Sequence, residues 1–172
     1  AGQHEYYLTH TMFLRPGALN LLLVDVHQFH VDCGDAEGEE GAYRKHVGYW
    51  IDSIQMHVPG AQVLIVGTHI DKFSDGTAGA AGSSDAASSD LGAVVDTIDA
   101  LIEEHMQMQQ RGGATKLCLA RVPEDATRPS AAVRAKYVHC VSCGDPDQSS
   151  ASQRLLGIES LVTSVALVSD NF

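Results

Sequence analysis

Residues 18–26 read ALNLLLVDV, and residues 62–67 read QVLIVG. Both are short apolar runs bounded by turn-forming or polar residues, and apolar side chains on both faces are typical of buried parallel strands. Between the two runs, apolar residues from Tyr43 to Ile54 recur with the spacing of a helix, which Pro59-Gly60 is expected to end. The acidic, glycine-rich stretch 32–41 is predicted to be a loop.

Strands and helices continue to alternate along the rest of the chain. The small, polar, repetitive stretch 74–90 is predicted to be a mobile low-complexity insertion, because it offers little apolar area to bury. The remaining predicted elements are a helix over 91–106 capped by Ser89 or Asp90 and ended by Gly112-Gly113, a weak strand over 116–122, a strand over 136–142, and a last helix over 155–165. This order predicts an α/β fold with a three-stranded parallel core and flanking helices.

Composition narrows the class of protein. The chain has 172 residues, the length of one domain, and a formal net charge of −11. Such an acidic chain is expected to repel phosphate backbones and anionic lipids, which argues against nucleic-acid and membrane binding. No apolar run is long enough to span a bilayer. The four cysteines form no pattern of a secreted disulfide framework, so we expect reduced thiols and a cytoplasmic protein.

Two polar segments directly follow predicted strands. Thr68-His69-Ile70-Asp71 follows the run 62–67, and Ser142-Cys143 ends the strand predicted over 136–142. Ligands of open parallel sheets bind at the carboxyl ends of the strands, so both segments are candidate binding residues. A carboxylate such as Asp71 can accept two parallel hydrogen bonds from guanine N1–H and N2–H, a donor pair that adenine lacks. Alternatively, Asp71 only caps the following turn, and Ser142-Cys143 is only a strand end.

These segments stand in the order of the guanine-nucleotide motifs of Ras-like GTPases, and the chain resembles the Roc domains of Roco proteins. The opening residues, 1-AGQHEYYLTHTMF-13, resemble the second switch of that family. Thr68–Asp71 resembles its guanine-specificity motif, which commonly reads Thr-His-apolar-Asp. The start of the last helix, 157-GIESL-161, is similar too. The resemblance covers most of 1–71 and 137–168, and it implies a Ras-like P-loop GTPase fold.

The resemblance also implies roles for single residues. Gln3 matches the residue that orients the attacking water, and Gly2 matches the glycine whose N–H contacts the terminal phosphate. Thr68, His69 and Asp71 would bind the base, and the backbone N–H of Cys143, after Ser142, would donate to the guanine carbonyl. Of these residues, Gln3 alone is implied to be catalytic.

Other parts of a GTPase are not encoded in this sequence. The phosphate-binding pattern GxxxxGK[ST] and a first switch with its magnesium-binding threonine are absent, so residues 1–172 resemble the C-terminal part of a Roc domain. The intact parent would bind GTP or GDP with Mg²⁺ and hydrolyse GTP slowly as a signalling switch, whereas this chain alone is expected to bind nucleotide weakly and to be inactive. Flanking Roco domains would supply protein partners, and a homodimer is possible. The strand 18–26 is expected to become an apolar sheet edge.

Two other functions stay open from the sequence. The first is a nucleotide-free protein interaction module that uses the exposed edge strand and its helices. The second is a metal or redox site at the CxxC of Cys140 and Cys143, with His27, His30 and Cys33 as further ligands at HxxHxxC spacing. A position for Cys140 inside a strand would point its thiol into the core and argue against that site.

Overall fold

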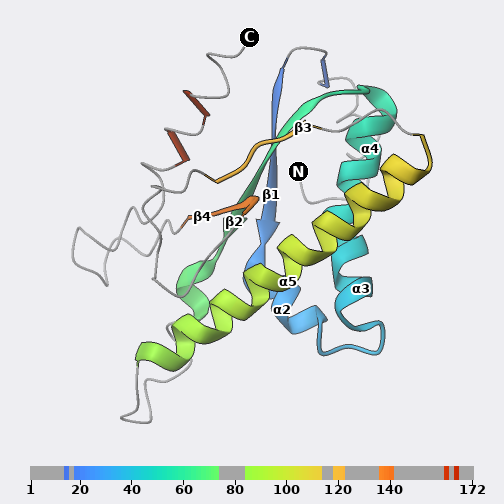
Figure 1. Cartoon of the computed structure of the whole chain (residues 1–172). Helices are drawn as coiled ribbons and strands as arrows, with labels where there is room; N and C mark the ends of the chain where they lie inside the picture. Colours follow the sequence, from blue (N-terminus) through green and yellow to red (C-terminus); the bar gives the residue numbers. More distant parts are fainter. Residues whose placement is uncertain are drawn as a thin grey trace.

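A parallel β-sheet lies at the centre of the part of the chain that the structure describes (Figure 1). This computed structural model describes residues 14–15, 18–73, 84–113, 118–122, 136–141, 161–162 and 165–166. The architecture is α/β, with helices packed against the sheet, as the alternating sequence pattern predicts.

Strand β2 (Gln62–Thr68) is the central strand. On one side, β1 (Leu19–Asp25) pairs with it in parallel over its whole length, from Leu19 opposite Gln62 to Asp25 opposite Thr68. On the other side, the short strands β3 (Cys118–Leu119) and β4 (Val138–Cys140) follow one another, pairing in parallel with the beginning and the end of β2. Four strands therefore make a parallel core that is three strands wide, and the predicted fold class is confirmed.

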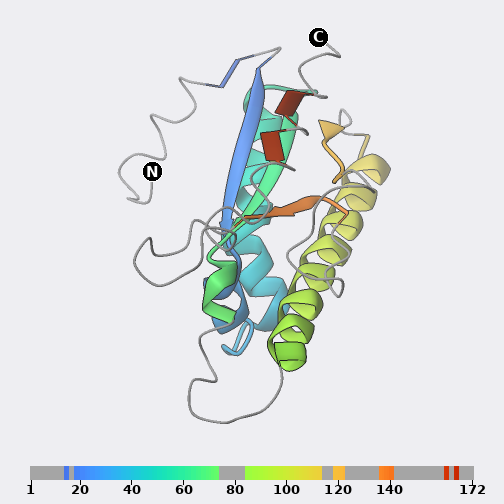
Figure 2. The same ribbon diagram turned by 90° about the vertical axis from the view of Figure 1, so that its left-hand side faces the viewer.

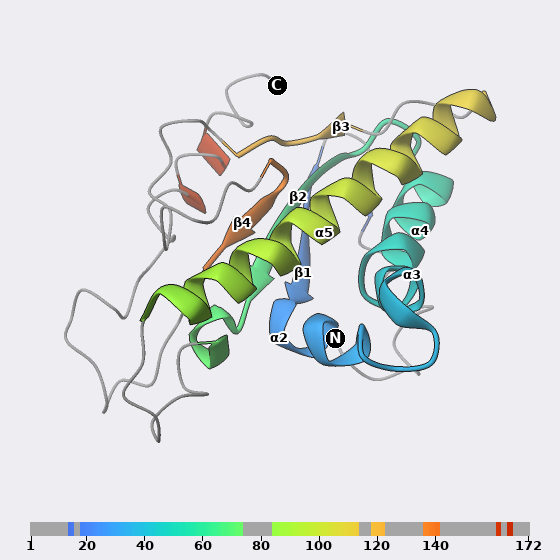
Figure 3. The same ribbon diagram turned by 60° about the horizontal axis from the view of Figure 1, so that its bottom comes forward.

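The long helices of the described residues pack on one face of the sheet (Figures 2 and 3). The connection from β1 to β2 contains α2 (Val26–Asp32), α3 (Gly38–Tyr43), a π-helical turn η3 (Arg44–Gly48) and α4 (Tyr49–His57). The connection from β2 towards β4 contains the 3₁₀ turn η4 (Ile70–Phe73) and α5 (Ser84–Arg111). The chain moves in the same direction across the sheet from β1 to β2 and from β2 to β4. Because both connections have the same hand, their helices lie on the same face of the sheet.

The core lies between that helical layer and the sheet. Alternate residues of the strands point into it, and the helices bury residues at i, i+3 and i+4 spacing. Its most completely buried side chains are Val24, Val26, Phe29, Val47, Ile51, Val63, Ile65, Val95, Ile98, Ile102 and Val138. The other face of the sheet carries Leu21 and Leu23, which remain 49% and 64% exposed on β1. In the described part of the chain β1 pairs with β2 alone, which agrees with the predicted apolar edge.

The loop prediction for residues 32–41 is wrong at both ends. The chain is already helical from Val26 to Asp32, and α3 begins at Gly38. The side chain of Asp25 accepts a hydrogen bond from the backbone N–H of Gln28 at 2.9 Å and so caps α2. Buried Ala42 and Tyr43 anchor α3, and acidic residues in its first turn favour the positive end of the helix dipole.

The insertion predicted over 74–90 is also wrong at its C-terminal end. Residues 84–90 are helical and form the first turns of α5, so neither Ser89 nor Asp90 caps this helix. Alanine has the highest helix propensity, and extending a helix that is already packed avoids the nucleation cost. Residues 74–83 lie outside the described part. The predicted end at Gly112-Gly113 is confirmed, with Gly113 at a φ of 73°.

Little of the C-terminal third falls among the described residues. The last predicted helix is represented by residues 161–162 and 165–166, which are helical. Among the described residues, the strand predicted over 116–122 comprises Cys118–Leu119, and the strand predicted over 136–142 comprises Val138–Cys140. Residues 116–117 and 142 lie outside the described part. Within the described residues, no helix combines the length and the apolar character that crossing a membrane requires.

Candidate functional site

The carboxyl ends of β1 and β2 lie side by side. Asp25, the last residue of β1, stands opposite Thr68, the last residue of β2. The Thr68 hydroxyl donates a hydrogen bond to the Val24 carbonyl at 3.2 Å, so its side chain ties the two strand ends together. Both strands therefore end at the same end of the sheet, the carboxyl end, where ligands of parallel sheets bind.

His69 turns the chain sharply as it leaves β2. Its φ is 59°, and it is the non-glycine residue with a positive φ among the described residues. A bulky residue in the left-handed region is strained by about 1–3 kcal/mol, and such residues concentrate at functional sites. The His69 imidazole Nε2 lies 3.7 Å from the Asp25 carboxylate, an ion-pair distance whenever the ring is protonated. Asp25 thus contacts both the start of α2 and the turn after β2.

The η4 turn presents Asp71 at this edge. Ile70 is buried and anchors the turn in the core, whereas Asp71 is half-buried and so keeps part of its side chain in contact with solvent. Phe73 closes the turn against α2, with its ring 5.8 Å from the His27 ring and 5.6 Å from the His30 ring. The buried side chain of Ile70 and the ring contacts of Phe73 with α2 therefore fix the position of the turn that carries Asp71.

Gly67 allows the neighbouring elements to approach β2 at this end. A Cβ added at this residue would lie 2.8 Å from a methyl of Val26 and 2.9 Å from a methyl of Val138. No side chain larger than hydrogen fits without a shift of those two packed residues. The Val141 N–H donates to the Gly67 carbonyl at 2.8 Å, so β4 also ends at this edge.

The structure brings together three of the seven residues that the sequence nominates. Thr68, His69 and Asp71 lie in one turn at the carboxyl end of β2. Gly2, Gln3, Ser142 and Cys143 lie outside the described residues. Sequence reasoning missed the supporting contacts of Asp25 and of Phe73 with the two histidines, for which the i, i+3 spacing of His27 and His30 was the available signal.

The proposed CxxC site does not gain a ligand from Cys140. Its side chain is 7% exposed and lies in the core, where burial raises the pKa of the thiol to about 12. A thiol buried in apolar surroundings in this way is typical of a structural core cysteine, which argues against the CxxC site. Burial, together with Glu39 and Asp32, also raises the pKa of Cys33. No three metal-ligating side chains gather among the described residues, and Cys143 lies outside them.

Comparison with known proteins finds partial similarity to two Roco-family proteins. The chain is 38% identical over 71 residues, 41% of its length, to a malignant fibrous histiocytoma-amplified sequence 1 homolog of Xenopus tropicalis. It is 30% identical over 73 residues, 42% of its length, to a probable serine/threonine-protein kinase roco6 of Dictyostelium discoideum. The matched regions span 6% and 3% of these relatives. No family model and no solved structure matches the chain.

Proposed function

We propose that this chain is the C-terminal portion of a Roc-type, Ras-like GTPase domain and that the edge at β1 and β2 binds the guanine base. The single observation that carries the proposal is the turn Thr68–Asp71, which lies at the carboxyl end of the central parallel strand with a half-buried carboxylate. The partial similarity to two Roco-family proteins supports the same assignment.

The chemistry of base recognition follows from Asp71. Its two carboxylate oxygens accept from guanine N1–H and from the exocyclic amine, which neither adenine nor a pyrimidine can imitate. Thr68 and His69 set the position of that carboxylate, one through its bond to Val24 and the other through its left-handed backbone and its approach to Asp25. The phosphates and Mg²⁺ would bind to a preceding phosphate loop and first switch in the parent, where Gln3 would orient the attacking water and Gly2 would contact the terminal phosphate. Residues Ser142 and Cys143 would complete the base site.

Binding of the base alone tests the proposal on this chain. Without a phosphate cradle the affinity for GMP is expected to be millimolar, which corresponds to about −4 kcal/mol. Nuclear magnetic resonance titration should shift the backbone amides of His69 and Asp71 with GMP and leave them unshifted with AMP at the same concentration. Shifts of equal size with the two nucleotides would contradict guanine recognition.

A substitution at the carboxylate sharpens this test. In Asp71→Asn the amide N–H faces guanine donors, which leaves a donor unpaired at about 1–3 kcal/mol, whereas the xanthine carbonyl can accept from it. The preference should move from GMP towards XMP by roughly tenfold. Asp35→Asn, an exposed carboxylate in the turn after α2, is the matched control and should leave the preference unchanged. An unchanged preference in Asp71→Asn would identify Asp71 as a turn cap only.

A nucleotide-free interaction module is the second candidate, and one observation favours it. Strand β1 carries Leu21 and Leu23, 49% and 64% exposed, and its outer side pairs with no other strand of the described residues. The strand itself contains no lysine or proline that would protect this edge. Substitution of both leucines by lysine should abolish self-association or partner capture if this edge is the working surface. The same variant should leave GMP binding at the turn after β2 unchanged, so association and GMP binding, measured separately, distinguish the two candidate functions.

A further inference from the structure

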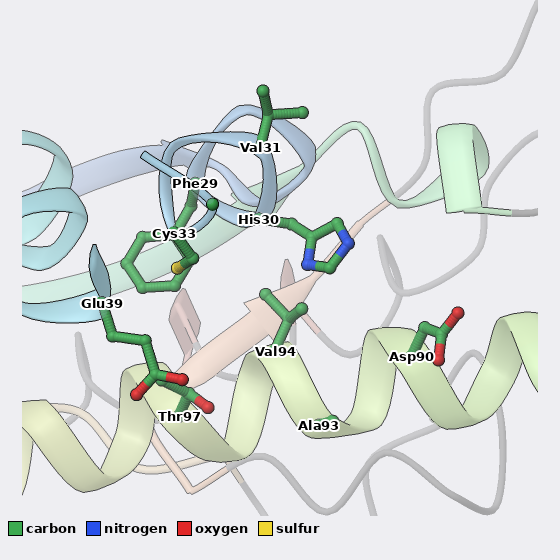
Figure 4. A pocket seen from close by; sticks show the side chains of 10 residues that line it. Phe29, His30, Val31, Cys33, Glu39, Asp90, Ala93, Val94 and Thr97 are labelled. Carbon is green, nitrogen blue, oxygen red and sulfur yellow. The ribbon is translucent and has the colours of Figure 1, made fainter. Parts of the chain in front are cut away.

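A groove separates α2 from α5 on the helical layer, and none of the residues that line it belongs to the turn Thr68–Asp71 (Figure 4). Its volume is about 580 Å³, within the range of sites that hold small ligands or peptide side chains. The floor is apolar and firmly packed, since Phe29 is fully buried and Val94 is 7% exposed. Polar and small residues complete the lining, among them His30, Cys33, Glu39, Asp90, Ala93 and Thr97.

The two carboxylates mark opposite ends of this groove. Figure 4 shows Asp90 at one end, Val94 in the middle, and the Glu39 carboxylate towards Thr97 at the other end. Because Asp90 and Thr97 are seven residues apart on one helix, the row is about 10 Å long. Both acidic residues are exposed, and no basic side chain of the described residues forms an ion pair with either.

We propose that the α2–α5 groove binds a basic peptide segment of a partner protein, with apolar side chains over Val94 and a cationic side chain at each end. An extended peptide advances about 3.3 Å per residue, so cations at positions i and i+3 span about 10 Å. Arg-Leu-Leu-Arg is the simplest sequence of this type. The formal net charge of −11 favours a cationic partner and opposes an anionic one.

The charges explain why a peptide fits better than a metal ion. A metal needs its carboxylates around one point, whereas Glu39 and Asp90 lie at the two ends of the groove, with Val94 and the His30 ring between them. No group of three metal-ligating side chains occurs in the described residues. An arginine side chain pairs a carboxylate with its guanidinium and covers apolar surface with its stem, which suits each end of the groove.

Fluorescence anisotropy with labelled peptides tests the proposal on the 172-residue chain. The probe is an Arg-Leu-Leu-Arg peptide with Gly-Ser flanks and blocked termini. Its comparators are the same peptide with glutamates for arginines and the isomer Arg-Arg-Leu-Leu. The probe should bind saturably and more weakly as salt rises, the acidic peptide should not bind, and the isomer should bind at least about threefold more weakly. No saturable binding, or equal binding of the acidic peptide, would overturn the proposal.

Substitutions then locate the bound peptide. Glu39→Gln with Asp90→Asn should weaken binding about fivefold to tenfold, as expected for two exposed ion pairs. Glu40→Gln is the matched control, because Glu40 follows Glu39 in α3 but pairs with Arg44 at 3.3 Å and does not line the groove. It should change binding less than about twofold. Unchanged binding in the double variant would place the peptide elsewhere and reject this groove.

A filled groove provides a second, independent variant. Ala93 lies on the exposed side of α5 and lines the groove, and arginine is nearly as good a helix former as alanine. Ala93→Arg should keep the melting temperature and abolish probe binding, because its guanidinium occupies the acidic groove. Full binding by a folded Ala93→Arg protein would also reject the proposal. GMP binding at Thr68–Asp71 is measured separately, so failure of either proposal can be told from failure of the other.

Discussion

Two buried carboxylates, Asp32 and Asp99, hold different parts of the molecule by different chemistry. Asp32 ends α2, is 8% exposed, and accepts hydrogen bonds from Lys45 Nζ at 2.6 Å, His46 Nε2 at 2.7 Å and Gln28 Nε2 at 2.8 Å. Asp99 lies in the middle of α5, is 4% exposed, and accepts from the backbone N–H groups of Lys136 and Tyr137. Asp32 is therefore surrounded by side-chain donors. Asp99 instead accepts hydrogen bonds from the two backbone N–H groups that directly precede β4.

The two surroundings shift the two pKa values in opposite directions. The hydrogen bond from Lys45, followed by those from His46 and Gln28, holds the pKa of Asp32 well below its usual range. Burial raises the pKa of Asp99 despite the two backbone hydrogen bonds that favour its ionised form. Cations therefore offset the desolvation of a buried carboxylate, whereas two amide dipoles do so only in part.

The largest expected effect comes from removing the carboxylate of Asp99. Asp99→Ala leaves the N–H groups of Lys136 and Tyr137 without their acceptor, and each unsatisfied buried donor is destabilising by about 1–3 kcal/mol. We expect the free energy of unfolding, measured by urea denaturation, to fall by about 2–4 kcal/mol. The control Asp96→Ala, exposed one turn earlier on α5, should change it by less than about 0.5 kcal/mol. A loss below about 1 kcal/mol at Asp99 would show that water replaces the carboxylate there.

Substitution of Asp32 should have a smaller effect. Asp32→Asn keeps one acceptor oxygen for three donors, but Lys45 is 66% exposed and can turn to water. The expected loss in the same denaturation experiment is about 1–2 kcal/mol. Asp35→Asn, in the exposed turn that follows, should stay within about 0.5 kcal/mol of the unsubstituted chain. A greater loss at Asp32 than at Asp99 would reverse the comparison between the two carboxylates.

The pH dependence of stability should separate the two carboxylates by sign. The folded-state pKa of Asp32 is lowered, so its contribution is present above its unfolded pKa of about 3.9 and is lost as the pH falls towards the folded value. The folded-state pKa of Asp99 is raised, so stability declines as the pH rises from about 3.9 through the folded value. Asp32→Asn should therefore flatten the acid-side loss, and Asp99→Asn should remove the decline. Urea midpoints from about pH 3 to pH 7 measure both effects, and slopes of equal sign would contradict the assignment.

The sequence could predict the elements that depend on local pattern. The apolar runs of β1 and β2 and the turn Thr68–Asp71 after β2 are found where the sequence predicts them, and Gly112-Gly113 does end α5. The predicted start of α5 is wrong because a composition of small polar residues does not by itself exclude a helix. Once a helix packs through Leu91 and Val95, its preceding alanines and serines extend it at low cost.

Contacts between distant segments could not be predicted. Asp99 finds its donors 37 and 38 residues away, and Asp32 finds two of its three donors 13 and 14 residues away, across the turn into α3. The spacing of residues in the sequence does not predict such pairs, because an aspartate that will be buried cannot be distinguished in the sequence from one that will be exposed. The same holds for Asp25, whose contact with His69 depends on the register of β1 against β2. The sequence around His69 does not predict its positive φ either, because glycine is the usual residue in that conformation.

The smallest expected effect tests whether Lys45 acts through Asp32. Lys45 Nζ lies 2.6 Å from a carboxylate oxygen that is nearly buried, whereas Arg44 pairs with Glu40 at 3.3 Å with both side chains about four-fifths exposed. Lys45→Gln should therefore lower the urea midpoint slightly at low salt, and Arg44→Gln should leave it unchanged. In the Asp32→Asn background, Lys45→Gln should have no further effect, because its partner charge is already gone. A midpoint loss that persists in that background would assign the effect of Lys45 to the packing of its stem against α2.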